Sequence, residues 1–538
     1  MNAPTIDNNG KDTKINGTTG GKFTLSGLRQ STPKAKELPP HDELLKIVAD
    51  EAKNAPFDFV EASYRAKEKD PKNNYISELR KKAGGNTPEA REALQKLSKI
   101  ENKIPQDDYA VMVNKHLVET FEVIRFCSHG GLVYGYNGAF WQMVEGSSFS
   151  QFLGKIAGVY GVPGLIPERV KFRKLLLEQF HAAAHHPTPT AAALANLNNG
   201  TLRIDSHGNA ALGAFDWREF VRYQLPYDYN PEATAPKLQT FLDEVLPNKN
   251  LQSIIFEFLG SCFAPGLKTD DKILLLYGQG ANGKSVLCDV VTALLGAVNI
   301  SHVNIDKLTQ QGQPGEFAAV ELDGKLLNFA TELDSKSVKS DLFKQLASRE
   351  PIRAAHKNKD AFTLTPPPMI TNCNDLPRTG ARDWGFYRRL LIIPFDVTIP
   401  PEEQDRNLAK KLIETELPGF LNLILAGLRR LITNGGHYTA NPQGDKLVSE
   451  LWAESDSVTA FLEDSFNIEI DSPTEYKRAR IYEIFKMYCS ENGRQALSNR
   501  QFFGLLRQRK FQELKGGDRP FVFPHPLTLE WENKYNAY

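Results

Sequence analysis

Eight residues near the middle of the chain have the composition and spacing of a phosphate-binding loop. The run Gly278-Gln-Gly-Ala-Asn-Gly283-Lys284-Ser285 satisfies the pattern Gly-x-x-x-x-Gly-Lys-Ser/Thr. Glycines in such a loop let backbone N–H groups close around phosphate oxygens, the lysine reaches the β- and γ-phosphates, and the hydroxyl binds Mg²⁺. The motif therefore predicts a site for ATP and Mg²⁺ formed by Gly278, Gly280, Asn282, Gly283, Lys284, Ser285 and Val286.

Hydrolysis also requires an acidic residue, a γ-phosphate sensor and, in many NTPases, an arginine supplied from elsewhere. An apolar run over residues 324–330 ends at Thr331-Glu332-Leu333-Asp334, so carboxylates follow a predicted strand. Glu332 is the candidate that would polarise the attacking water and, with Ser285, hold Mg²⁺. A lone glutamate after a strand is more often a solvated loop residue, and the phosphate loop is what favours a catalytic interpretation here.

Two other polar positions adjoin apolar runs. Residues 366–377 read as a short strand followed by Asn374, whose amide is suited to hold a water against the γ-phosphate, and we favour it over Asn372. Arg388 and Arg389 begin the apolar run that ends at Phe395. One of these arginines could reach the nucleotide of a neighbouring subunit.

These candidates need a sheet and helices to hold them. Residues 272–277 form a buried-strand pattern before the loop, and apolar residues after it share one helical face until Gly296 ends the pattern. Strand, loop and helix thus follow one another as a phosphate-binding loop requires. Apolar strands alternate with helical stretches from residue 251 to about 435, which predicts an α/β sheet covered by helices.

Length and composition limit the class of protein. At 538 residues the chain is long enough for about three or four folded units. Lys plus Arg and Asp plus Glu both total 65, so any nucleic-acid site must be local. No apolar run approaches the roughly 18–20 residues that cross a bilayer, and no signal sequence is evident, so we expect an intracellular protein with no membrane partner. Five scattered cysteines fit a reducing compartment and argue against a zinc site.

Composition also divides the chain ahead of the predicted core. Residues 1–40 have few large apolar side chains and read as a flexible tail. Residues 41–105 predict short charged helices, for which a solvated linker or packing appendage is favoured over direct DNA contact. Residues 106–250 read as a folded domain that precedes the core, and its adjacent His185 and His186 lack a second ligand cluster that would indicate a metal.

Residues 445–538 read as a separate winged-helix domain. Two helical stretches are followed by a Gly-Gly-Asp turn that could join the strands of a wing. Basic residues crowd around the second helix and would face a duplex if the domain reads DNA, whereas a role in packing or protein contact has equal weight. These residues are Arg500, Arg507, Arg509 and Lys510.

Together the motifs resemble superfamily III helicases, and within them the phage and plasmid primase-helicase family related to the poxvirus primase-helicase. GQGANGKS resembles that family's G-x-G-x-N-G-K-S loop, CNDLP its N-x-L-P sensor segment, and RRLLIIPF its R-x-x-x-x-P-F strand. Ahead of the loop, NGTLRIDSHGN through LPYDYNPEATAPKLQTFLDEVLP resembles the domain that precedes the helicase. The resemblance covers roughly residues 115–538.

The resemblance implies an AAA+-like ATPase core that works as a ring, usually a hexamer, and moves 3′→5′ on single-stranded DNA. It gives the Walker A role to Lys284 and Ser285, the Walker B role to Glu332, the sensor role to Asn374 and the trans-acting finger role to Arg389. Arg388, the preceding residue, is the less favoured candidate for the finger. Relatives often pair two acids in Walker B, whereas here a threonine precedes the glutamate and an aspartate lies two positions beyond it, so the residue that assists it stays open.

Between the acidic and sensor segments, residues 352–365 form two alternating stretches around a polar, basic tip, which predicts a β-hairpin. On the residues alone, a basic turn is usually just solvated. Superfamily III rings carry such a hairpin in their channel, so the resemblance makes His356, Lys357 and Lys359 contacts to DNA phosphates. A ring of hairpins would concentrate positive charge in one salt-sensitive pore despite the zero net charge of the chain.

These observations favour an ATP-dependent replicative DNA helicase of a phage, plasmid or mobile element, acting in the cytoplasm of a bacterial host. Its expected partners are single-stranded and forked DNA, further copies of the chain in a hexamer, and a separate primase or polymerase. The roughly one hundred residues ahead of the resemblance are too few for a primase fold and carry no zinc-binding cysteines. The alternative is a nucleotide-switched ATPase that assembles at an origin without processive unwinding.

Overall fold

The structure, a computed structural model, describes residues 41–53, 57–67, 75–120, 126–185, 192–310, 312–330, 340–357, 361–377, 384–455, 457–492, 496–515 and 519–536. Four residues of the predicted catalytic and DNA-binding segments lie outside these ranges: Thr331, Glu332, Asp334 and Lys359. His186 and the tail expected over residues 1–40 also lie outside the described residues.

The chain divides into two compact units, Met1–Thr188 and Pro189–Tyr538. Their boundary falls inside residues 106–250, which the sequence analysis treats as one domain. The physical reason is that two hydrophobic cores share this segment. Its first part packs with the helices that precede it, and its second part packs with the large sheet that follows.

In the first unit, helices pack on a small antiparallel sheet with strand order β1-β2-β3. The elements are α1 (His41–Ala52), α2 (Phe59–Lys67), α3 (Tyr75–Ala83), α4 (Pro88–Glu101), α5 (Gln106–Thr120), β1 (Phe126–His129), β2 (Leu132–Tyr136), β3 (Trp141–Val144), α6 (Gly146–Val159) and α7 (Val170–Ala183). Buried aromatic residues such as Phe149, Phe172 and Phe180 fill the core. Helices α3 and α4 pack on each other around Ile76 and Leu97, so the predicted charged helices are present.

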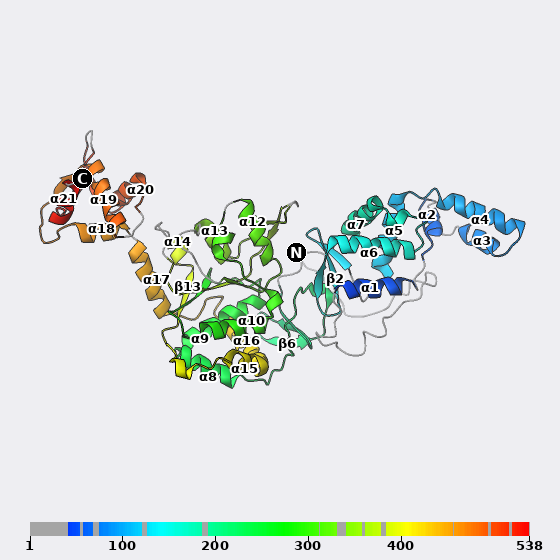
Figure 1. The fold of residues 1–538 in the computed structure, drawn as a ribbon, viewed down its shortest axis with the longest axis horizontal. Helices are drawn as coiled ribbons and strands as arrows, with labels where there is room; N and C mark the ends of the chain where they lie inside the picture. The colour runs from blue at the N-terminus through cyan, green and yellow to red at the C-terminus, as the bar shows by residue number, and fades with distance from the viewer. Residues whose placement is uncertain are drawn as a thin grey trace, which may run out of the picture. The chain divides into compact units, whose positions relative to one another are not determined.

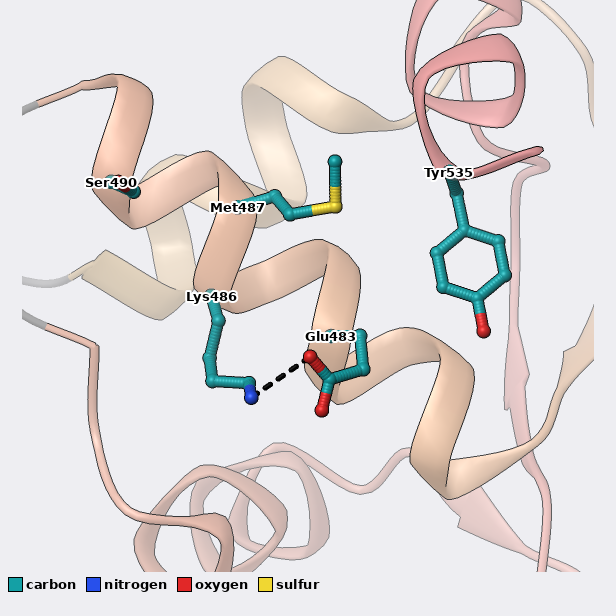
Figure 2. Close-up of a pocket in the computed structure, with 5 residues that line it drawn as sticks. All are labelled: Glu483, Lys486, Met487, Ser490 and Tyr535. Atoms are coloured by element: carbon teal, nitrogen blue, oxygen red, sulfur yellow. Dashed lines mark ion pairs between the residues drawn. The ribbon is translucent and has the colours of Figure 1, made fainter. Parts of the chain in front are cut away.

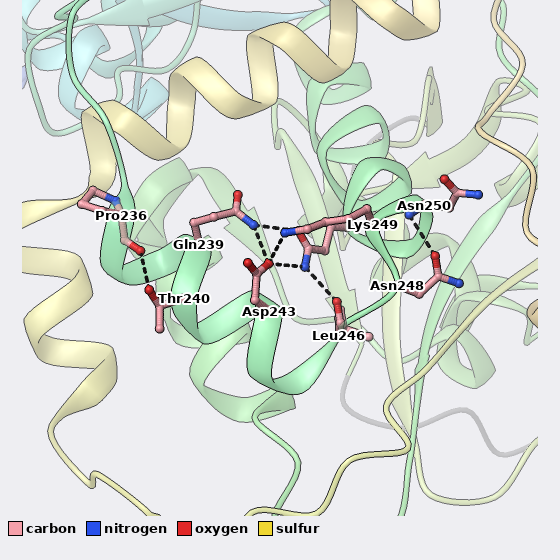
Figure 3. A network of polar contacts seen from close by, with 9 residues as sticks. Pro236, Gln239, Thr240, Asp243, Leu246, Asn248, Lys249 and Asn250 are labelled. Atoms are coloured by element: carbon pink, nitrogen blue, oxygen red, sulfur yellow. Dashed lines mark hydrogen bonds and ion pairs between the residues drawn. The ribbon is translucent and has the colours of Figure 1, made fainter.

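The second unit begins with an antiparallel sheet and a pair of helices. These elements are β4 (Ala193–Leu197), β5 (Gly200–Ile204), β6 (Ala210–Gly213), α8 (Pro236–Val245) and α9 (Lys249–Gly260). A polar network around Asp243 holds the turn between α8 and α9, as Figure 3 shows. The Asp243 carboxylate accepts hydrogen bonds from Lys249, from Gln252 at 2.8 Å and from Gln239 at 2.7 Å. Led by the Lys249 bond, they lower the pKa of Asp243 to about 2.

A five-stranded parallel sheet forms the centre of this unit, with strand order β13-β7-β12-β9-β8. The strands are β7 (Ile273–Tyr277), β8 (Ile300–Ser301), β9 (Leu327–Ala330), β12 (Met369–Cys373) and β13 (Leu390–Pro394). The helices around it are α10 (Lys284–Leu295), α11 (Ile305–Leu308), α12 (Gln313–Ala319), α13 (Ser340–Ala347), α14 (Trp384–Tyr387), α15 (Leu408–Thr415), α16 (Leu417–Thr433) and α17 (Pro442–Ser455). The α/β prediction for this segment is confirmed.

Both faces of the sheet are buried. Successive residues of a strand face opposite sides, so Leu274 and Leu276 enter one core while Ile273 and Leu275 enter the other. Figure 1 shows α9, α10 and α16 on one face and α12 and α13 on the other. Coverage of both faces is what continuous apolar strands in a parallel sheet require.

The strand order changes direction at β7. Its neighbours β12 and β13 are the last two strands of the sheet in the chain, whereas β8, the next strand after β7, lies at the far edge. Ligands of open α/β sheets bind outside the carboxyl ends of the strands at such a point. The loop that follows β7 therefore stands where this fold favours a ligand.

The C-terminal residues form a small module with an aromatic core of its own. It consists of α18 (Ser457–Ser465), β14 (Thr474–Tyr476), α19 (Arg478–Glu491), α20 (Asn499–Gln508), β15 (Gln512–Glu513), β16 (Phe521–Phe523) and α21 (Leu529–Asn536). The strands form an antiparallel sheet in the order β14-β16-β15. Ser498 and Gln501 make a capping box at the start of α20, the second of the two helices that the sequence predicts.

Candidate functional site

The glycine loop between β7 and α10 has a backbone that side chains tolerate poorly. The φ angles are +110° at Gly280, +48° at Ala281 and +82° at Gly283. A Cβ added at Gly283 would lie 2.7 Å from Cγ1 of Val245 and 2.9 Å from Cε2 of Phe241. The end of α8 therefore packs directly against the loop at Gly283, the residue that precedes α10, and only glycine fits there.

Lys284 is folded into this loop. Its side-chain amine donates a hydrogen bond to the backbone carbonyl of Gly278 and another, of 3.2 Å, to Oδ1 of Asn282. Only 7% of Lys284 is exposed, and burial lowers the pKa of its ammonium group. An ammonium held by two neutral oxygens in a buried place is well prepared to accept a phosphate anion.

Asn282 ties the loop to the end of β13. Its Nδ2 donates a hydrogen bond of 3.2 Å to the carbonyl of Phe395. A Cβ at Gly278 would lie 2.3 Å from this Nδ2 and 2.6 Å from the Phe395 carbonyl oxygen. The absence of a side chain at Gly278 is therefore what lets the amide reach the strand.

Ser285 and Val286, the next two residues of α10, have different environments. Ser285 is exposed at the first turn of the helix, whereas Val286 is half-buried and packs against the core. The Ser285 hydroxyl is accessible to a ligand. The Val286 side chain packs against the core, so only the backbone of Val286 is a candidate ligand contact.

The sensor candidates lie beside the loop, at the end of β12. The Gln279 side chain donates a hydrogen bond of 2.9 Å to the backbone carbonyl of Asn374, whose own side chain is exposed. Asn372 instead contacts the thiol of Cys288 on α10, with 3.5 Å from Nδ2 to Sγ. The two asparagines thus differ, since one side chain joins β12 to α10 and the other is open to solvent.

Arg389 lies at the other end of the sheet. Its carbonyl accepts a hydrogen bond from the N–H of Ile273, the first residue of β7, whereas the glycine loop follows the last one. Five residues at about 3.3 Å each separate the two positions by roughly 16 Å. Arg389 is 9% exposed, and its side chain contacts Asp271, Ser348 and Gly385 of its own chain. Arg388 is exposed.

The predicted hairpin is confirmed. β10 (Ile352–Ala355) pairs antiparallel with β11 (Ala361–Leu364). At its tip, the half-buried His356 ring stacks on Phe362 with 5.7 Å between ring centroids, and Lys357 is exposed. Arg353 forms an ion pair of 3.2 Å with Glu316 of α12, a contact that the sequence analysis did not anticipate. The hairpin is therefore held on α12 by its stem while Lys357 projects into solvent.

The basic residues of the C-terminal module are partly engaged within it. Arg507 pairs with Glu513 at 2.6 Å and Arg509 donates to Thr459 at 2.7 Å, whereas Arg500 and Lys510 are exposed. A pocket between α19 and α21, shown in Figure 2, is lined by an ion pair, two hydroxyl groups and apolar surface. Its lining residues are Glu483, Lys486, Met487, Ser490 and Tyr535. It contains none of the predicted site residues.

Two features are absent from the parts of the chain that the structure describes. In those parts, no group of three or more His, Cys, Asp or Glu side chains is arranged to hold a metal ion. Of the helices that the structure describes, none combines the length and apolar character needed to span a bilayer.

Two protein families match parts of the chain. A family described as D5 N terminal like matches residues 112–247, and a family of unknown function, DUF5906, matches residues 276–389. The second match contains the glycine loop, the hairpin and the sensor segment, and it ends at the arginine that precedes β13.

Curated viral proteins match over part of their length. A protein named helicase in Acanthamoeba polyphaga mimivirus is 28% identical over 170 residues, which are 30% of this chain and 17% of the relative. A protein named primase in African swine fever virus is 26% identical over 206 residues, or 37% of this chain and 21% of the relative. The chain therefore matches about a fifth of the length of these relatives. The matches support a viral primase-helicase family.

Among solved structures, the apo NrS-1 C-terminal region aligns with 77% of this chain and 98% of that chain, at 11% identity and a TM-score of 0.42. A second apo structure of the same region has a TM-score of 0.43.

The structure brings part of the predicted site together. Lys284, Asn282 and the backbone of Asn374 meet around the loop, while Arg389 lies at the opposite end of the sheet. The sequence analysis missed Gln279 as a tether of the loop. It also missed Phe241, which forms the floor of the loop from α8. Gln279 occupies a position of the phosphate-loop pattern at which any residue is allowed, and Phe241 lies outside the pattern, so no local signal indicates either residue.

Proposed function

We propose that the chain is an ATP-hydrolysing DNA helicase that acts in replication, with an AAA+-like core that moves 3′→5′ along single-stranded DNA as a hexameric ring. The observation that carries the proposal is Lys284, buried in a glycine loop at the carboxyl end of β7 and adjacent to the sensor segment. The names helicase and primase of the matched viral relatives point to the same activity.

ATP and its Mg²⁺ would bind at the loop that follows β7. The amine of Lys284 would leave the Gly278 carbonyl for the β- and γ-phosphates, because charged oxygens are stronger partners for an ammonium than a carbonyl is. The exposed hydroxyl of Ser285 would bind Mg²⁺. Glu332, which follows β9 in the chain, would support Mg²⁺ and polarise the attacking water.

The sensor and the arginine would complete the site. The exposed amide of Asn374 would orient the water against the γ-phosphate. The arginine would come from the next subunit, because an arginine at the opposite end of the sheet cannot reach its own chain's nucleotide. The family resemblance favours Arg389 for this role, whereas exposure favours Arg388. We keep Arg389 as the proposed finger and Arg388 as its alternative.

DNA would bind in the channel of the ring. Lys357 projects from the hairpin tip, where one cation per subunit would contact the phosphates of a single strand, and His356 and Lys359 would flank it. Arg500 and Lys510 of the C-terminal module, which has the element order expected of a winged helix, would contact duplex DNA or a partner protein such as a primase or polymerase.

Unwinding of a forked duplex with a 3′ tail, with and without ATP and Mg²⁺, tests the proposal. We expect the wild type to separate the strands. Lys284→Ala should lose both hydrolysis and unwinding, and Lys357→Ala should hydrolyse ATP but unwind poorly. Lys410→Ala, which removes an exposed lysine from α15, is the control and should behave as the wild type. ATP-dependent assembly on DNA with no strand separation on either tail polarity would contradict the helicase and leave the nucleotide-switched assembly protein.

A further inference from the structure

Asn282 links the lysine of the phosphate loop to the last strand of the sheet. Its Oδ1 accepts a hydrogen bond from Lys284, and its Nδ2 donates one to the carbonyl of Phe395, each at 3.2 Å. Only 3% of Asn282 is exposed, so water does not replace either bond. The orientation of the amide is forced. A rotated amide would set its oxygen against the carbonyl and its NH₂ group against the ammonium.

The acceptor of this bond is fixed to the sheet. The N–H of Phe395 donates to the carbonyl of Tyr277 at 2.7 Å, and β13 pairs with β7 over all five of its residues. Every residue of β13 is buried. Because a buried, fully paired strand moves as one body, a displacement at one end of β13 reaches the other end.

The other end of β13 carries the two arginines. The carbonyl of Arg389 accepts from the N–H of Ile273 at 2.9 Å, and the carbonyl of Arg388 accepts from the amine of Lys272 at 2.7 Å. One short strand thus has the arginine pair at its amino end. At its carboxyl end it has the carbonyl that holds Asn282, and through it Lys284.

We propose that Asn282 is a positioning residue that makes the place of Lys284 depend on β13, so that contact of the arginine pair with a neighbouring subunit's ATP adjusts the lysine of this chain's own site. The inference rests on the proposed ring ATPase and adds a route between its adjacent sites. Since the route joins two binding events, ATP turnover by the oligomer is cooperative, and breaking the route at Asn282 removes the cooperativity.

Two substitutions distinguish the hydrogen bond that Asn282 makes to Lys284 from the one that it makes to Phe395. Asn282→Ala removes both hydrogen bonds. Asn282→Asp has nearly the same size and keeps an acceptor for Lys284, but it has no donor for the Phe395 carbonyl. Gln279→Ala is the matched control, because it removes a tether that joins the same loop to β12 instead of β13.

The experiment measures ATP turnover by the full chain on single-stranded DNA as a function of ATP concentration. We expect both Asn282 variants to lower kcat by about tenfold and to change a sigmoidal dependence on ATP into a hyperbolic one. Gln279→Ala should raise KM and keep the sigmoidal dependence. If the alanine variant does not fold, as judged by circular dichroism, the aspartate variant carries the comparison.

Three results would overturn the inference. They are sigmoidal turnover by Asn282→Asp, equal loss of cooperativity in Gln279→Ala, and hyperbolic turnover by the wild type. Each of these leaves ATP hydrolysis intact, so the proposed function survives them. A wild-type chain that hydrolyses no ATP on any DNA would instead contradict the proposed function, and the inference with it.

Discussion

At the scale of single residues, the glycine loop between β7 and α10 depends on positions where a side chain is missing. Gly283 has a φ of +82° and lies against Phe241 and Val245, whereas Gly280 has a φ of +110° and nothing within 4 Å of an added Cβ. The two glycines therefore separate the cost of backbone strain from the cost of steric overlap.

We expect Gly283→Ala to reduce the free energy of unfolding more than Gly280→Ala does. Backbone strain costs about 1–3 kcal/mol at either position, and overlap with α8 adds about 1–3 kcal/mol at Gly283 alone. Thermal unfolding measures the stability of each variant, and titration with a fluorescent ATP analogue measures the affinity of its loop for nucleotide. Equal destabilisation by the two variants would show that α8 yields to the added methyl group.

The arginines at the start of β13 differ in a way that can be measured. Arg389 is buried and pairs with Asp271 at 3.3 Å, so its removal also disturbs its own subunit, whereas Arg388 is exposed. Burial does not exclude a role in the neighbouring site, because an ion pair can exchange its partner when the next subunit docks.

Mixing variants identifies the arginine that acts between subunits. Lys284→Ala keeps both arginines but lacks the lysine of the loop. Arg389→Ala keeps that lysine but lacks the proposed arginine finger. We expect the mixture to hydrolyse more ATP than either variant alone, because some interfaces then combine an intact loop with an intact arginine. Arg388→Ala is tested in the same way, and recovery with Arg388→Ala alone would move the role to that residue.

At the scale of secondary-structure elements, the turn between α8 and α9 holds α8 against the glycine loop. The Asp243 network fixes this turn, and α8 supplies the side chains that contact Gly283. The pKa of Asp243 is lowered to about 2, so the folded state favours the charged carboxylate. The stabilisation is complete above the ordinary pKa of about 4 and is lost as the pH falls from about 4 to about 2.

We expect Asp243→Asn to lower the midpoint of thermal unfolding at neutral pH and to flatten its dependence on pH between about 4 and 2. The effect will be modest, since the Asp243 side chain is 47% exposed. Glu244→Gln, at an exposed neighbouring position on α8, is the control and should follow the wild-type profile. If Asp243→Asn lost as much stability in acid as the wild type does, the acid-dependent stability could not be assigned to the Asp243 carboxylate.

Much of this element level was predictable from the sequence. The strand before the loop is visible as a continuous apolar run, and the helix after it and the hairpin at residues 352–364 are visible in local periodicity. The contact between Asn282 and Phe395 was not predictable, since the two residues are 113 positions apart. The burial of Arg389 also depends on a tertiary partner, Asp271, that no spacing rule indicates.

At the scale of the whole molecule, the chain contains two units whose hydrophobic cores share no residue. Residues 106–250 were predicted as one domain because periodicity reports that a face is apolar and does not report which core that face enters. The D5 N terminal like match, at residues 112–247, also crosses this boundary.

Separate cores predict separate unfolding. We expect calorimetry of the full chain to show at least two transitions, of which a non-hydrolysable ATP analogue with Mg²⁺ raises only one. At a ligand concentration about one hundred times Kd, the stabilisation is about 2.7 kcal/mol. Lys284→Ala should abolish this shift without moving the transition that ATP leaves unchanged. A single cooperative transition, or a shift of every transition with ATP, would contradict independent units.

The bond between Asn282 and Phe395 also orders events during synthesis. A ribosome releases the glycine loop long before it releases Phe395, and at about 5–20 residues per second the 113 positions from Asn282 to Phe395 take about 6–23 seconds. During that interval the nascent chain carries the complete loop sequence without the strand that fixes it. The loop therefore reaches its folded geometry late in synthesis, and a chain truncated before Phe395 would contain the motif without the hydrogen bond that holds Asn282.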